Sequence, residues 1–349
     1  NARHLPNDLP PRDHYYVDGS PSVADVWLYP SETAVPGGPS DWSSWHTVMI
    51  GGLRQGGEAL YALDVTNPDG VTGGPGYPSY LWEFPCEDQS RAQCTGPGTY
   101  AWADYMGETW SQPVITKVRM TPTCAGTCPA WVDRWVAIFG AGYHESGDPN
   151  EATGAAYDTT LSASTSRKGR AVFMVDIKTG KVLATKRFDH DPTQGDPAMR
   201  YAFASAPAVF DTDYDGYADV VYIGDLGGQL WKWVIQAPAE DTIGASASGD
   251  VRQPGWFWKR LFVARPCTAP TCTPTHTKSM FFPPTGARLH GDLYLAFGTG
   301  ERARLDYAGT APEERNRYYV LRDRDPLERV TPVPPAVDPD PRYTDTPST

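Results

Sequence analysis

Residues 206–234, APAVFDTDYDGYADVVYIGDLGGQLWKWV, decide the fold class of this chain. Three short runs in this stretch are rich in Val, Tyr, Trp and Phe, which are enriched in β-strands. An aspartate-rich loop separates the first run from the second, and a Gly-rich loop separates the second from the third. The stretch therefore predicts consecutive antiparallel strands joined by loops.

The same pattern recurs along the chain as an apolar run that ends in glycine, a loop and a second apolar run. The glycines are Gly51, Gly140, Gly224 and Gly298. The paired runs are HTVMIGG (46–52) with ALYALDV (59–65), RWVAIFGAG (134–142) with AVFMVDIKTG (171–180), DVVYIGD (219–225) with GQLWKWV (228–234), and LYLAFGTG (293–300) with RYYVLRD (317–323). Self-similarity of this kind is typical of repeat architectures.

Further strands are predicted on both sides of each pair. A strand with a Ser-Pro or Ser-x-Pro opening precedes three pairs, at GSPSVADVWL (19–28), WSQPVITKV (110–118) and SAPAVFD (205–211), and KSMFFPP (278–284) is a weaker fourth copy. A fourth strand follows three pairs, at SYLWEF (79–84), VLATKRF (182–188) and WFWKRLF (256–262), with only VTPVP (330–334) after the last pair.

Units of about four short strands, repeated four times, predict an all-β chain built as a β-propeller. A β-sandwich or two stacked β domains are the alternatives. Four blades are few for a propeller, so we expect an incomplete one. Long insertions are expected at 85–108, 119–133, 142–168 and 264–276. We divide the chain into an N-terminal extension (1–13), the propeller (14–330) and a Pro-rich tail or linker (331–349).

The composition narrows the functional classes. The chain has 349 residues, with 30 Lys and Arg against 42 Asp and Glu and a net charge of −12. Nucleic-acid-binding domains usually show the opposite balance, so no nucleic-acid partner is expected. No apolar run approaches the roughly 18 residues of a transmembrane helix, so the chain is not expected to span a membrane as a helix.

The six cysteines form three local couples in loops rich in Pro, Gly and Thr. They are Cys86 with Cys94, Cys124 with Cys128, and Cys267 with Cys272. An even count of locally paired cysteines suggests disulfides that clip the insertions in an oxidising compartment. A zinc site and free buried thiols are the alternatives, although none of the spacings is CxxC.

The loop that begins at Asp211 has the ligand spacing of a calcium site. Asp211, Asp213 and Asp215 occupy positions 1, 3 and 5, the Tyr217 carbonyl is at position 7, and Asp219 is at position 9. Calcium takes six to eight oxygen ligands, as in the EF-hand loop. Position 12 is Tyr222 instead of the glutamate that an EF-hand requires, and strand-like runs flank the loop. We therefore predict a Ca²⁺ site in a hairpin of the third blade, with a solvated acidic turn as the alternative.

Several of these motifs together resemble the C-terminal propeller of PilY-type proteins, which are adhesins and biogenesis factors associated with the tip of type IV pili. They are HYYVDGSPSVADVWL (14–28), WHTVMIGGLRQGGEALYALDVTNP (45–68), MGETWSQPVI (106–115), KGRAVFMVDIKTGKVL (168–183), APAVFDTDYDGYADVVYIGDLGGQLWKW (206–233) and FGTGERARLD (297–306). The resemblance implies a quinoprotein-like propeller at the cell surface, at the pilus tip or associated with the outer membrane. It also implies calcium at the aspartate loop and a role in attachment, pilus extension and retraction.

On this basis the expected partners are minor pilins at the pilus tip and a host or abiotic surface receptor. The chain is not expected to be an enzyme. A quinone-dependent dehydrogenase-like enzyme and a purely structural surface or fibre component are the alternatives. Asp64, Asp176 and Asp225 match a hairpin of quinoprotein dehydrogenases, where such residues brace turns. Three aromatic residues are predicted either to form an adhesive face or to pack between blades, namely Trp102, Tyr105 and Trp110.

Overall fold

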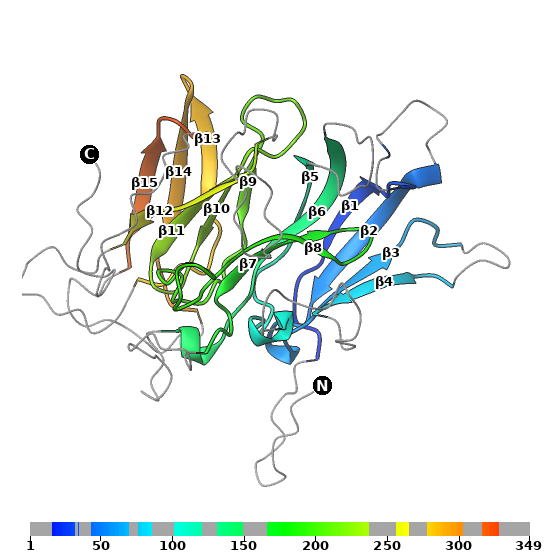
Figure 1. The fold of residues 1–349 in the computed structure, drawn as a ribbon, viewed down its shortest axis with the longest axis horizontal. Helices are drawn as coiled ribbons and strands as arrows, with labels where there is room; N and C mark the ends of the chain where they lie inside the picture. Colours follow the sequence, from blue (N-terminus) through cyan, green and yellow to red (C-terminus); the bar gives the residue numbers. More distant parts are fainter. Residues whose placement is uncertain are drawn as a thin grey trace, which may run out of the picture.

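The structure is a computed structural model, and it describes residues 16–31, 34, 43–69, 76–85, 101–120, 131–148, 166–236, 256–264, 278–302 and 316–327. These residues form four antiparallel sheets whose strands follow one another in chain order. Figure 1 shows the sheets side by side, from β1–β4 in blue to β13–β15 in orange and red. This is the blade arrangement that the repeats predict.

Three of the sheets have four strands and the last has three. The first contains β1 (Ser22–Trp27), β2 (Trp45–Gly52), β3 (Leu60–Asp64) and β4 (Ser79–Phe84). The second contains β5 (Val114–Met120), β6 (Val132–Gly140), β7 (Ala171–Asp176) and β8 (Val182–Arg187). The third contains β9 (Ala208–Phe210), β10 (Val220–Gly224), β11 (Gln229–Val234) and β12 (Phe257–Val263), and the fourth contains β13 (Thr285–Leu289), β14 (Asp292–Gly298) and β15 (Tyr318–Asp323).

The sheets pack face to face, because their strands are apolar on both faces. In β6, Ala137 and Phe139 pack against the first sheet, whereas Val136 and Ile138 pack against the third. Successive side chains of a strand point to opposite faces, so one strand serves two interfaces. A further apolar cluster joins the third sheet to the fourth through Tyr222 and neighbouring residues. Burial between blades, and not within a single central core, therefore stabilises the fold.

The first strands of successive sheets lie nearest one another, with β1 against β5 and β5 against β9. The segments that enter these strands also contact one another. The Ser22 hydroxyl donates to the Pro113 carbonyl at 2.6 Å, and the Ser111 hydroxyl donates to the Ser205 carbonyl at 2.8 Å. Ser22, the first residue of β1, and Ser111, the serine of the second opening motif, thus each bind the entry of the next blade.

Two predicted boundaries are corrected. KSMFFPP (278–284) is not a strand, and β13 begins at Thr285 instead. Pro283 and Pro284 lack the N–H that a sheet ladder needs, so the strand begins after them. The insertion predicted at 119–133 is shorter, since β5 continues to Met120 and β6 begins at Val132.

The predicted aromatic face is corrected as well. Trp102 is 3% exposed and Tyr105 is 1% exposed, and both pack in the core between the first and second sheets. Trp102 lies edge-on to Phe173 of β7, with ring centroids 5.5 Å apart. These two residues therefore follow the alternative of packing between blades, and only Trp110 of the three is partly exposed.

Several predictions fall outside the described residues. They concern all six cysteines, VTPVP (330–334), the extension at 1–13 and the tail at 331–349. The described part of the chain contains no helix with the length and apolar character needed to cross a membrane.

Candidate calcium-binding hairpin

The aspartate loop connects β9 to β10, as the sequence predicts. It brings one carboxylate oxygen each from Asp211, Asp213 and Asp215 within 4.8 Å of one another. Asp213 and Asp215 are exposed and Asp211 is half-buried, so the group is open to solvent. Because the three side chains offer only carboxylate oxygens, the donor set suits a hard cation such as Ca²⁺.

Backbone N–H groups of the loop hold these carboxylates in place. Asp211 accepts from the N–H of Tyr214 at 2.6 Å and from that of Gly216 at 2.8 Å. Asp213 accepts from the N–H of Asp215 at 3.1 Å. The loop reverses through left-handed backbone at Tyr214 (φ 64°) and Gly216 (φ 87°). Glycine adopts this conformation without steric cost, which accounts for Gly216 at the predicted turn position.

Asp219 differs from the other three aspartates. It is buried, it is not part of the group of three, and its Oδ2 accepts from both the N–H and the hydroxyl of Thr212 at 2.6 Å. Burial raises the pKa of Asp219, and the negative charges of Asp213 and Asp211 raise it further. A cation near this side chain would offset the repulsion. The ligand roles predicted for Asp219 and for the Tyr217 carbonyl remain predictions.

The aspartate hairpin forms hydrogen bonds with the second blade. Ala218 donates its N–H to the Lys117 carbonyl of β5 at 2.8 Å, and the Tyr217 hydroxyl donates to Asp133 of β6 at 2.7 Å. Above the Tyr217 ring lie the Lys117 ammonium, 4.0 Å from the ring centroid, and the Arg119 guanidinium, 3.9 Å from it. These contacts could not be predicted from the sequence, because Lys117, Arg119 and Asp133 lie in another repeat and belong to no recognisable motif.

The predicted turn braces are confirmed. Asp64 accepts from the Thr66 N–H at 2.9 Å, Asp176 accepts from the Thr179 N–H at 2.8 Å, and Asp225 accepts from the Gly227 N–H at 2.9 Å. Asp64 and Asp176 are the last residues of β3 and β7, and Asp225 directly follows β10, so each carboxylate closes the loop that follows a strand. Hydrogen bonding within the turn gives these groups a structural role.

Asp225 is the most deeply buried of these braces. Its Oδ1 accepts from the N–H groups of Gly227 and Gln229, and its Oδ2 accepts from the Gln229 amide and the Trp231 indole, all within 2.9 Å. Burial raises the pKa of Asp225 to about 7, although these four hydrogen bonds act in the opposite direction.

Asp225→Asn should destabilise the folded chain. One carboxylate oxygen, which accepts two hydrogen bonds, would be replaced by an NH2 group, which can only donate. We expect a loss of about 2–4 kcal/mol in the free energy of unfolding. Denaturation with urea at about pH 8 measures this difference. Asp191→Asn is the matched control, since Asp191 is exposed, braces an equivalent turn through Thr193 and retains its acceptor as Asn. Equal stability of the two variants would contradict the prediction.

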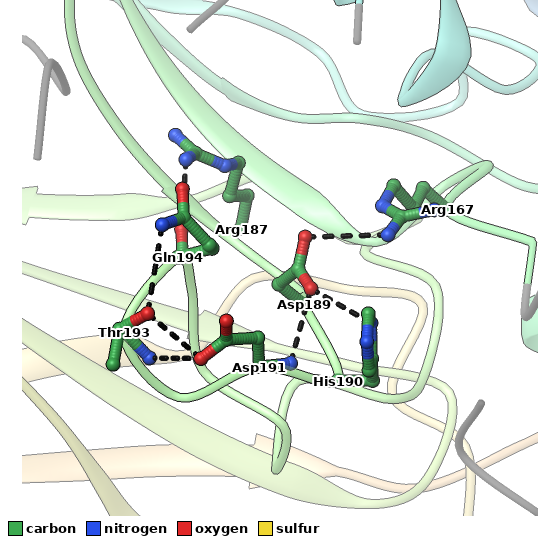
Figure 2. A network of polar contacts seen from close by, with 7 residues as sticks. All are labelled: Arg167, Arg187, Asp189, His190, Asp191, Thr193 and Gln194. Atoms are coloured by element: carbon green, nitrogen blue, oxygen red, sulfur yellow. Dashed lines mark hydrogen bonds and ion pairs between the residues drawn. The ribbon is translucent and has the colours of Figure 1, made fainter. Parts of the chain in front are cut away.

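A second polar cluster lies in the loop after β8 (Figure 2). Asp189 is paired with Arg167 at 3.3 Å and with His190 at 2.9 Å, and the Arg187 guanidinium donates to the Gln194 carbonyl at 2.7 Å. At the tip, hydrogen bonds from Thr193 lower the pKa of Asp191. Asp189 is turned toward Arg167 and His190, whereas Arg187 and Asp191 bind neutral groups of the loop. The cluster therefore shapes the loop.

Comparison with known proteins agrees with this architecture. A family model described as the PilY1 beta-propeller domain matches residues 10–326. A type IV pilus biogenesis factor PilY1 homolog of Xylella fastidiosa is 31% identical over 256 residues, which are 72% of this chain and 13% of the relative. The type IV pilus biogenesis factor PilY1 of Pseudomonas aeruginosa is 27% identical over 223 residues, which are 64% of this chain and 13% of the relative. The crystal structure of the Pseudomonas aeruginosa PilY1 C-terminal domain has 22% sequence identity and a TM-score of 0.47, and the match covers 82% of this chain and 45% of that chain.

The fold and its repeated blades define the class of protein as a β-propeller. Within this class, the chain belongs to the PilY1 β-propeller domain family of type IV pilus biogenesis factors. It spans only 13% of the length of each of the two curated relatives described above.

Proposed function

We propose that the chain is the calcium-binding propeller of a type IV pilus tip adhesin or biogenesis factor, acting in surface attachment and in pilus extension and retraction. The observation that carries the calcium assignment is the convergence of Asp211, Asp213 and Asp215 within 4.8 Å. Family membership supports the pilus context. Minor pilins at the pilus tip and a surface receptor are the partners that this function requires.

In the proposed role, the ion neutralises the loop carboxylates and fixes the hairpin between β9 and β10. The hairpin also contacts β5 and β6 through Ala218 and Tyr217, so its geometry affects two blades. Calcium would therefore act on the shape of one face of the propeller rather than on a chemical reaction.

Calorimetry on chelator-stripped protein tests the calcium assignment. The wild-type chain should bind one Ca²⁺, whereas Asp213→Ala/Asp215→Ala should show no measurable binding, because two of the three converging carboxylates are gone. Asp69→Ala/Asp191→Ala removes two exposed carboxylates elsewhere and should bind as the wild type does. Absence of binding to the wild type, or unchanged binding to the first variant, would overturn the assignment.

The cellular role needs the whole parent protein. Cells that carry Asp213→Ala/Asp215→Ala in that protein should attach poorly to surfaces and show altered twitching motility. A pulldown against minor pilins distinguishes the proposed function from that of a purely structural component. Only the proposed function requires the protein to bind minor pilins specifically. Normal attachment and motility in cells whose protein has lost calcium binding would contradict the proposed role.

A further inference from the structure

A pocket lies at the end of the propeller axis where the first strands begin. The segments that enter the four blades line it together with the ends of two β-hairpins, and its volume is about 200 Å³. The second blade contributes Trp110 to the lining, and the fourth contributes Phe282. Arg54, which follows β2, and Arg302, which follows β14, also line the pocket. Because all four described blades contribute to the lining, the pocket is a property of the assembled propeller.

Two guanidinium groups and an indole form one side of this pocket. The Arg54 guanidinium lies 4.6 Å from the centroid of the Trp110 ring, and that of Arg302 lies 5.6 Å from it. Arg302 also lies 5.2 Å from the centroid of Phe282, which is largely exposed. Stacking on aromatic rings orients a guanidinium and leaves its edge N–H groups available to a ligand.

The two arginines are balanced by one lining carboxylate. Arg54 is paired with Asp18 at 2.9 Å, whereas Arg302 has no ion pair in the part of the chain that the structure describes. Burial lowers the pKa of Arg302, as does the nearby positive charge of Arg54, whereas the negative charge of Asp18 raises it. Arginine nevertheless stays protonated in proteins, so the pocket lining keeps one uncompensated positive charge.

The neighbouring acidic side chains do not compensate this charge from within the pocket. Glu108 accepts from the Trp110 indole at 3.1 Å, and Glu301 is directed to the Ser279 hydroxyl and to the Arg302 backbone N–H. Neither glutamate lines the pocket. An anion that enters would meet the Arg302 guanidinium beside an aromatic wall.

From this geometry we infer that the pocket binds a carboxylate group carried on a compact apolar body, such as an amino-acid residue with a free α-carboxylate. Among the described lining residues, Arg54, Arg302 and Asp18 leave one net positive charge, which matches the one charge of a carboxylate, whereas a phosphate monoester carries between about 1.5 and 2. The volume is below the roughly 300–1,000 Å³ of pockets for drug-sized ligands, so one residue is the appropriate scale. The carboxylate can belong to a free N-acylated amino acid or to the C-terminal residue of a protein.

The experiment uses the full 349-residue chain. N-acetyl-L-leucine is titrated while the indole N–H resonance of Trp110, assigned with Trp110→Phe, is followed by NMR. The wild type should show saturable shifts, and N-acetyl-L-leucinamide, which lacks the charge, should not bind. Arg302→Gln should weaken binding roughly tenfold, the typical value of a charge-assisted hydrogen bond. Arg302→Lys should recover part of the affinity.

The matched control is Arg324→Gln, which removes an exposed arginine after β15 and should leave binding unchanged. Melting curves check that each variant is folded. A short Gly/Ser peptide ending in leucine separates the two sources. If it binds more tightly than N-acetyl-L-leucine, the ligand is a chain terminus, and if only the small acid binds, the ligand is a free acid. Equal binding of the amide, unchanged binding by Arg302→Gln, or no saturable shift in the wild type would overturn the inference.

Discussion

Asp323→Ala should lower the free energy of unfolding by about 3–5 kcal/mol, because it leaves a buried ammonium group without its counterion. Lys232 of β11 is fully buried, and its Nζ lies 2.8 Å from Oδ2 of Asp323 in β15. The same oxygen accepts from the Tyr222 hydroxyl at 2.7 Å. One carboxylate therefore satisfies two buried donors and joins the third blade to the fourth.

Burial lowers the pKa of Lys232, and the charge of Asp323 opposes this change. Without Asp323, burial and the positive charge of Lys259 both disfavour the ammonium group, and only the charge of Asp325 opposes them. Tyr222→Phe/Lys232→Met/Asp323→Leu removes the three polar side chains together and should recover most of the lost stability, since no unpaired group stays buried. Asp292→Ala is the control, because Asp292 pairs with the exposed Arg322 and should cost less than about 1 kcal/mol. Chemical denaturation measures all four proteins, and a cost for Asp323→Ala no larger than this control would contradict the prediction.

Calcium should raise the free energy of unfolding by about 2.7 kcal/mol when its free concentration is one hundred times the dissociation constant. This follows if the folded hairpin binds one ion and the unfolded chain does not. The measurement is denaturation of the wild type with calcium and with excess chelator. Asp213→Ala/Asp215→Ala should have the same stability in both conditions.

The stabilisation should also be local. Ala218 donates to Lys117, and Asp219 donates its N–H to the Phe210 carbonyl, so opening the hairpin exposes these amides. Hydrogen exchange should therefore accelerate at these two N–H groups on chelation, and much less in β2 and β3 of the first blade. Uniform acceleration over all blades, or no difference in stability between the two conditions, would argue against a hairpin site.

Strand pairs could be predicted where the residues on both faces of a strand are apolar. The four glycine-ended runs correspond to β2, β6, β10 and β14, because packing between blades selects Val, Ile, Leu and aromatic residues. β13 was missed because its sequence, TGARL, is mostly exposed and carries no apolar pattern. Local sequence indicates a strand only when burial of the strand requires a recognisable pattern of apolar residues.

The parts of the site that depend on distant segments could not be predicted. The aspartate spacing indicates a hairpin with converging carboxylates, since all its groups lie within one loop. The contact of Tyr217 with Asp133 joins residues that are 84 positions apart. Trp102 and Tyr105 looked suited to an exposed face, and only the packing of two blades places them in the core.

The strand β5 extends from the axial pocket to the aspartate hairpin. Pro113, directly before it, lines the axial pocket, while Lys117 and Arg119 contact the aspartate hairpin. At about 3.4 Å per residue, Lys117 and Arg119 lie roughly 14 and 20 Å from Pro113 along the strand. An occupant of the pocket and an ion in the hairpin therefore do not compete for space, and both can be held at once. An influence between them can pass along β5 or along β9, since Ala206 also lines the pocket and Asp211 directly follows β9. Thermodynamic linkage makes any such influence reciprocal. If the proposed ion and the proposed carboxylate ligand both bind, occupancy of the hairpin would then change the affinity of the pocket for its ligand, and the reverse.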